Sequence, residues 1–178
     1  MAEFKRVLEG LGFSEVRTLL NSGNAVFAAP GRPSVRRAAK QAGTKQAGTK
    51  QAGTKHAAAI ASALRASCDL DIPVIVKSAA ELSEVVADCP MAPPEAEHSR
   101  FLVALAQTAE ALRALEPLRE LATGQDRLTI TDAAAYLHCP AGVLESKIGA
   151  ALLGKAGRQV TTRNWGTILK LASLLQPE

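Results

Sequence analysis

The sequence predicts an α+β fold of two related halves, each a split β-α-β (ferredoxin-like) arrangement with antiparallel or mixed sheets and packed helices. Along the 178 residues, short apolar runs bounded by turn signals alternate with segments of helical periodicity. One β-hairpin is expected in each half. A proline-rich connection, residues 89–99, separates the halves, so we expect them to comprise residues 1–88 and 100–178.

The first half is predicted to run helix, hairpin, helix, strand, helix. Apolar residues at helical spacing from Phe4 to Leu11 indicate the first helix, and the run Asn21-Ser22-Gly23-Asn24 is typical of a tight hairpin turn. Ser78 is the expected cap of the last helix. The later elements are therefore predicted at residues 16–20, 25–28, 57–67, 72–77 and 78–88.

A basic insertion is expected at residues 31–55. It contains QAGTK three times in succession at 41–55, and the glycine and threonine of each repeat weaken a helix, so we expect a mobile segment. Without its cations the chain keeps 14 basic residues against 17 acidic ones, so the net charge of +4 is largely a property of this segment. The cations are Arg32, Arg36, Arg37, Lys40, Lys45, Lys50 and Lys55.

The second half is predicted to run β-α-β-β-α-α. Thr108 is the expected cap of its first helix, and Pro117 is expected to bend that helix. Its leading strand, 100–106, has no counterpart in the first half. We therefore expect that the chain lacks an N-terminal strand, either because its start is assigned too late or because it is a truncated copy. The remaining elements are predicted at 127–131, 133–139, 143–154 and 164–175.

The composition excludes several function classes. Three scattered cysteines and three histidines have no metal-ligand spacing, and no nucleophile or carboxylate constellation is present, so we predict no metal, no cofactor and no catalytic residue. Aromatic residues make up 3% of the chain, too few for a base-stacking surface, which argues against specific nucleic-acid binding. No apolar run is long enough for a membrane span, and a cytoplasmic location is expected.

Several motifs carry a family resemblance. LEGLGFSEVRTLLNSGNAVF, YLHCPAGVLESKIG and TTRNWGTILKLASLL resemble the bacterial domain-of-unknown-function 1697 family over most of the chain outside residues 31–55. The resemblance implies an α+β fold of two related halves in a cytoplasmic protein without an assigned activity. Family members begin with a strand and a glycine-containing loop ahead of the first helix, and this chain departs from that pattern.

The start of the last helix is the candidate site. It lies in an acid-free stretch, 146–177, and a helix N-terminus with flanking hydroxyl and guanidinium groups can bind an anion. The alternative is purely structural, with threonine caps, a Trp165 ring in the core and an arginine paired with a carboxylate. The residues proposed to hold a small anionic, phosphate-bearing ligand are Thr161, Thr162, Arg163, Asn164, Arg158 and Lys155.

Two functions follow as hypotheses. The first is binding of that small anionic ligand without catalysis. The second is a protein–protein interaction or oligomerisation module, which would use the strand edge exposed by the missing N-terminal strand.

Overall fold

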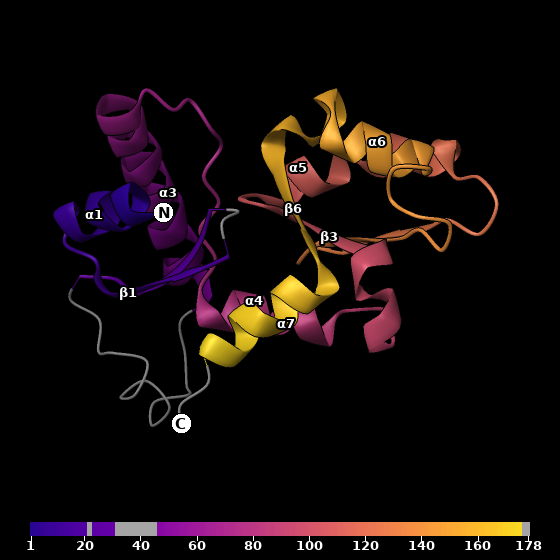
Figure 1. Cartoon of the computed structure of the whole chain (residues 1–178), viewed down its shortest axis with the longest axis horizontal. Helices are drawn as coiled ribbons and strands as arrows, with labels where there is room; N and C mark the ends of the chain where they lie inside the picture. Colours follow the sequence, from indigo (N-terminus) through magenta and orange to yellow (C-terminus); the bar gives the residue numbers. More distant parts are fainter. Residues whose placement is uncertain (21–22, 31–45, 176–178) are drawn as a thin grey trace. The chain divides into compact units, whose positions relative to one another are not determined.

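A computed structural model of the chain describes residues 1–20, 23–30 and 46–175. By its internal contacts the chain divides into two compact units, which we call unit 1 (Met1–Val76 with Leu171–Glu178) and unit 2 (Lys77–Lys170). Helices and antiparallel strands alternate in both units (Figure 1), which confirms the α+β class. Among the described residues, no helix combines the length and the apolar character required to cross a bilayer.

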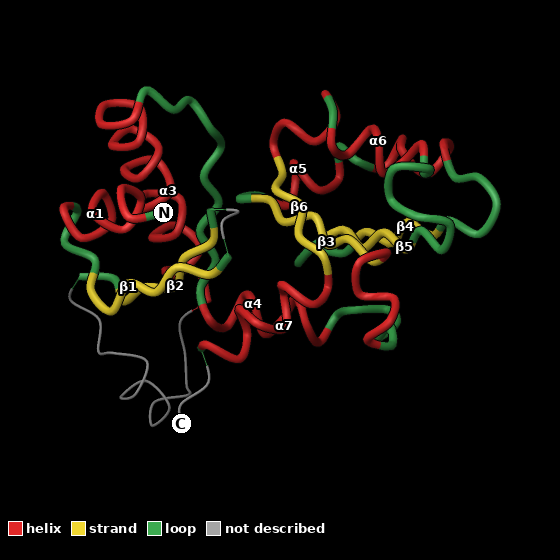
Figure 2. The backbone as a smooth tube through the Cα atoms, in the orientation of Figure 1, coloured by secondary structure: helices red, strands yellow, loops and turns green. Residues whose placement is uncertain are grey.

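Unit 1 contains a helix, a hairpin and a long second helix. The hairpin strands pair antiparallel, with Thr18 opposite Ala25, and lie side by side in Figure 2. Gly12, at φ +82°, provides the left-handed turn between the first helix and the hairpin. Asn21 and Ser22 of the predicted turn lie outside the described residues. The elements are α1 (Ala2–Gly10), β1 (Ser14–Leu19), β2 (Asn24–Ala28) and α3 (Gln46–Cys68).

Helix α3 corrects the prediction for the repeats. Two QAGTK units, residues 46–55, are helical, whereas residues 31–45, with five of the seven clustered cations, lie outside the described residues. Buried positions of α3 recur at helical spacing, so contact with the core holds the helix although each glycine costs about 1 kcal/mol. These positions are Gly53, Ala57, Ile60 and Leu64.

Residues 72–77, predicted as a strand, belong to no sheet in the structure. Figure 2 shows the whole stretch between α3 and α4 (Ala79–Ala87) as a loop. Val74 and Val76 nevertheless pack against the same apolar cluster as Phe27 of β2. The apolar sequence therefore places the segment on the core, but a strand also requires a neighbouring strand with which to form hydrogen bonds.

Unit 2 has a four-stranded antiparallel sheet with the order β4-β5-β3-β6. The first strand, β3, lies in the interior of the sheet. It is followed by a helix, a hairpin and a second helix, and the last strand then pairs with the edge of β3 that faces away from the hairpin. This is split β-α-β connectivity. Thr108 and Ser146 accept the hydrogen bonds that cap α5 and α6. The elements are β3 (Phe101–Ala106), α5 (Ala109–Arg113), β4 (Arg127–Ile130), β5 (Ala135–His138), α6 (Lys147–Leu153) and β6 (Val160–Asn164).

Strand β6 is absent from the sequence prediction. It pairs antiparallel with β3, with Thr162 opposite Ala104, and is followed by helix α7 (Trp165–Leu174). The three successive β-branched residues 160–162 favour a strand. However, threonine and asparagine just before a helix are also typical N-cap residues, so the same stretch could be interpreted as the start of the last helix. The second half therefore runs β-α-β-β-α-β-α.

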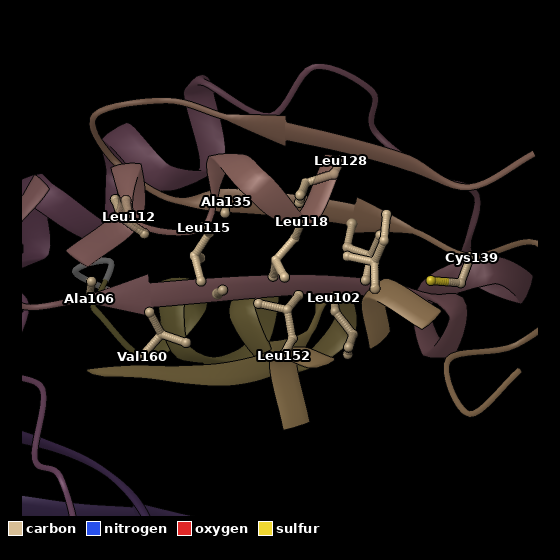
Figure 3. Close-up of a cluster of buried hydrophobic side chains, with 13 residues drawn as sticks. Leu102, Ala106, Leu112, Leu115, Leu118, Leu128, Ala135, Cys139, Leu152 and Val160 are labelled. Carbon is tan, nitrogen blue, oxygen red and sulfur yellow. The ribbon is translucent and has the colours of Figure 1, made fainter. Parts of the chain in front are cut away.

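Different helices pack on the two faces of the unit 2 sheet. On one face, β3 contributes Leu102, Ala104 and Ala106 to a cluster with leucines from α5 and the 3₁₀ helix η2 (Glu116–Leu121), which point toward the strands in Figure 3. On the opposite face, the buried Tyr136 hydroxyl donates a 2.8 Å hydrogen bond to the Val85 carbonyl of α4. Because of such contacts α4 belongs to unit 2, although residues 78–88 were expected in the first half.

Candidate functional site

The predicted anion site lies in a strand followed by a helix. Side chains alternate along β6, so Thr161 and Arg163 share one face of the sheet while Thr162 and Asn164 share the other. The helix begins only at Trp165. The two threonines therefore do not cap α7, contrary to the structural alternative drawn from the sequence.

Arg163 makes contacts within its own strand. Its Nη1 donates to Thr161 Oγ1 at 2.6 Å and to the Thr162 carbonyl oxygen at 2.7 Å. Burial lowers the pKa of the guanidinium from its ordinary value, although an arginine remains charged at neutral pH. These contacts fix the orientation of the guanidinium, and a ligand at Nη1 would have to replace them.

Asn164 is the cap of α7. Its Oδ1 accepts hydrogen bonds from the Thr167 backbone N–H at 2.9 Å and from the Thr167 hydroxyl at 2.8 Å. Thr167 is the third residue of the helix, which is the usual partner of an N-cap side chain. The side-chain oxygen thus satisfies one of the helix's free N–H groups, the kind of group that an anion would contact.

Trp165 is a core residue. It is 4% exposed, and its ring meets the ring of Phe101 edge-on at a centroid distance of 5.8 Å. Phe101 is the first residue of β3 and is itself 1% exposed. The ring therefore packs the start of α7 against the sheet and presents little surface to a ligand.

The remaining two predicted residues, Lys155 and Arg158, are exposed and belong to the 3₁₀ helix η3 (Lys155–Gln159). η3 lies before the first residue of β6, whereas Asn164 is the last residue of β6. A five-residue strand is about 13 Å long, so η3 and Asn164 lie at opposite ends of the strand. The structure thus brings Thr161 and Arg163 together but places the six predicted residues on two faces and at two ends of one strand. Anion binding stays a prediction.

Replacement of Asn164 by alanine is expected to lower the free energy of unfolding by about 1 kcal/mol, because the Thr167 N–H loses its acceptor. Asn164→Asp keeps an acceptor at the cap and should change stability by only a few tenths of a kcal/mol. Urea denaturation followed by circular dichroism measures both. Equal losses in the two variants would contradict the capping role.

A second feature is the outer edge of β2, to which the sequence analysis assigned no residues. By this we mean the edge of residues 25–28 that faces away from β1. No third strand pairs with β2 among the described residues. The side chains of Ala25 and Phe27 point into the unit 1 core, where the Phe27 ring lies 4.4 Å from that of Phe13. The strand is thus anchored on the core, and within the described ranges its outer edge has no partner strand.

The two edges of this hairpin differ in how they are protected. Proteins shield exposed strand edges with charges, proline or bulges. β1 has charges and a bulge-like irregularity. Glu15 and Arg17 are charged residues of β1, and its register shifts between Ser14 and Arg17. β2, with the sequence NAVFA, contains neither a charged residue nor a proline. Its composition is that of a strand with neighbours on both sides.

Two exposed apolar side chains follow α3 in the chain. Leu70 and Ile72, which follow α3, are 46% and 48% exposed. They precede Val74 and Val76, which pack on the core. Residues 70–76 therefore combine an exposed apolar part with an anchored one, next in sequence to the helix that covers the hairpin.

Reactive side chains in unit 2 have structural roles. Ser146 donates to buried Asp126 at 2.8 Å and accepts from the Gly149 N–H at 3.1 Å, capping α6. Burial raises the pKa of the nearby Cys139 thiol, which has no exposed surface. Within the described part of the chain, no three His, Cys, Asp or Glu side chains are grouped to hold a metal ion.

Two units with antiparallel sheets and packed helices define a small α+β protein. Residues 1–53 and 47–136 match the family described as "Protein of unknown function (DUF1697)", and the two matches meet within the QAGTK repeats. Since they span residues 1–136 of 178, the chain belongs to this family, which confirms the resemblance. Comparisons with curated proteins and with solved structures gave no match.

Proposed function

We propose that unit 1 is a strand acceptor, which binds an extended segment of another polypeptide chain at the outer edge of β2. Strand addition of this kind supplies backbone hydrogen bonds along an exposed sheet edge. The observation that carries the proposal is the difference between the hairpin edges: β1 has charges and an irregular register, whereas β2 has no protective residue.

Comparison of the units, each taken by itself, supports the same function. The series α1, β1, β2, α3 in unit 1 follows the order of α5, β4, β5, α6 in unit 2. In unit 2, β5 has β4 on one side and β3 on the other. β2 has only β1. Within the described residues, the position beside β2 that corresponds to the position of β3 in unit 2 holds no strand, and the added segment would take that position.

The test uses an acetylated and amidated peptide, Lys-Val-Thr-Val-Thr-Val-Lys, labelled with fluorescein and titrated with the full chain. The expected result is a saturable rise in fluorescence anisotropy with one peptide bound per chain. The peptide Lys-Val-Thr-Pro-Thr-Val-Lys lacks a central N–H and should not bind. No saturable binding of the first peptide, or equal binding of both, would refute strand addition.

A matched pair of fusions locates the site. One carries Phe-Leu-Val-Ala-Leu-Ala-Gln-Thr, the sequence of β3 and its link to α5, directly before Met1. This strand should occupy the outer edge of β2 and abolish peptide binding. The other carries Gly-Ser repeats of equal length and should bind like the parent chain. Unchanged binding to the first fusion would place the peptide elsewhere.

Binding of a small anion near β6 is the second candidate. Exposed Lys155 and Arg158, within the acid-free stretch 146–177, are the observation that favours it. A phosphate group near them would gain most at low ionic strength, because exposed charges are screened by salt. Thermal shift with pyrophosphate tests this: stabilisation that is lost in the Lys155→Ala/Arg158→Ala double variant supports it, and no stabilisation excludes it.

A further inference from the structure

We infer that unit 2 binds the surface of an anionic lipid bilayer through the outer side of α6. The protein would lie on the bilayer without crossing it. The binding surface, which we call the α6 surface, combines two exposed leucines with three exposed cations. The inference concerns unit 2 alone and is independent of strand addition to unit 1. The residues of the α6 surface are Leu144, Leu153, Lys147, Lys155 and Arg158.

Helix α6 has one buried side and one exposed side. Ile148 and Leu152 are buried in the apolar cluster on one face of the unit 2 sheet. At about 100° per residue, Lys147, Ala150 and Leu153 fall within an arc of roughly 120° on the opposite side of the helix. All three are exposed. Figure 1 shows α6 and α4 on opposite sides of β3, so the exposed side of α6 points away from the sheet.

The two leucines lie at opposite ends of α6. Leu144, in the turn before the helix, is 81% exposed, and Leu153, the last helical residue, is 55% exposed. The turn is fixed to the helix, because Val143 packs against the apolar cluster and a Cβ at Gly149 would overlap the Val143 carbonyl oxygen. Insertion of both leucines into the interfacial region of a bilayer would remove this apolar surface from water.

Cations lie beside both leucines. Lys147 follows Leu144 by three positions, and Lys155 follows Leu153 by two. The 3₁₀ helix η3, which contains Lys155 and Arg158, packs against α6. None of the three cations forms an ion pair within the described part of the chain. Exposed positive charge without a counter-ion attracts the negative surface of an anionic membrane.

Exposed apolar residues in unit 1 have the opposite charge around them. Leu70 lies directly between Asp69 and Asp71, whose carboxylates would be repelled by an anionic bilayer. By contrast, Glu145 is the only acidic residue between positions 133 and 177. Apolar exposure and positive charge therefore coincide at the α6 surface, which is the combination that an anionic membrane interface requires.

The form of the α6 surface favours a bilayer over other anionic partners. A dissolved anion would contact Lys155 and Arg158 but would gain nothing from the leucines. A protein partner would have to supply a pocket for each of two side chains at opposite ends of a convex helix. A bilayer accommodates both leucines among its acyl chains while its headgroups meet the cations, and needs no preformed pocket.

Co-sedimentation of the full chain with vesicles tests the inference. One set of vesicles contains phosphatidylglycerol and phosphatidylcholine in equal parts, and the other contains phosphatidylcholine alone. The protein should sediment with the first set and stay in solution with the second, and added salt should release it. Leu144→Ser/Leu153→Ser should weaken binding by roughly tenfold or more. Lys155→Gln/Arg158→Gln should weaken it by roughly fivefold for each charge removed.

Leu70→Ser/Ile72→Ser is the matched control. It removes two exposed apolar side chains from acidic surroundings and should sediment like the parent. All the replaced side chains are exposed, so the near-ultraviolet circular dichroism of the buried Trp165 should stay unchanged. No sedimentation with anionic vesicles, unchanged binding of the α6 leucine variant, or an equal loss in the control would each overturn the inference. Stabilisation by pyrophosphate without vesicle binding would assign the cations to a soluble anion instead.

Discussion

Replacing Trp165 by alanine is expected to lower the free energy of unfolding of unit 2 by about 3–5 kcal/mol. The ring is 4% exposed and packs edge-on against Phe101, so its removal leaves a large cavity at the start of α7. Tyr136, the single tyrosine, is also buried in unit 2, so its near-ultraviolet circular dichroism follows this unit after the tryptophan is gone.

Trp165→Phe is the matched control. It keeps an aromatic ring opposite Phe101 and leaves a smaller cavity, so it should cost clearly less than the alanine variant. A loss below about 1 kcal/mol in Trp165→Ala would show that the ring contributes little to the core, since truncation of a buried aromatic side chain costs several times more. The tryptophan would then be available for a binding role.

Local signals predicted most of the fold. The cap of α4 can be read directly, because Ser78 and Glu81 form a reciprocal capping box in which each side chain bonds the other's backbone N–H. The predicted cap of α5 is also found: the Thr108 side chain accepts a hydrogen bond from the Ala111 N–H. In both cases the interaction joins residues three positions apart, so its signal is complete within a short stretch of sequence.

The two strand errors have one physical cause. Residues 160–164 form a strand because β3 lies beside them, whereas residues 72–77 form none because no strand of the described part of the chain pairs with them. Strand formation depends on a partner that is distant in sequence, whereas composition reports only the tendency of the segment itself. The sequence of 72–77 is the more apolar of the two, yet pairing decides the outcome.

The candidate sites were predictable to different degrees. The sequence indicated a polar cluster before α7, but the division of labour inside it depends on geometry: Asn164 caps the helix while Arg163 bonds along the strand. The unprotected edge could be assigned to β2, rather than β1, only once the register of the hairpin was known.

Replacing Gly157 by alanine is expected to destabilise unit 2 by about 2–3 kcal/mol, the cost of overpacking a site that cannot relax. An added Cβ would overlap the Leu152 carbonyl oxygen and lie 2.7 Å from its carbon. These are backbone atoms at the end of α6, and Leu152 belongs to the buried cluster of unit 2. No side-chain rotation relieves the overlap, so η3 and α6 must move apart.

Gly166→Ala in α7 is the matched control for this clash. Its Cβ would meet the His98 Nδ1 at 3.4 Å, at the limit of ordinary contact, and alanine favours a helix over glycine by roughly 0.5–1 kcal/mol. Its stability should therefore stay within about 1 kcal/mol of the parent. Urea midpoints from the Tyr136 signal compare the variants. Similar midpoints for both would mean that the η3–α6 junction adapts to a side chain at Gly157, and that this close backbone approach is not needed to position β6.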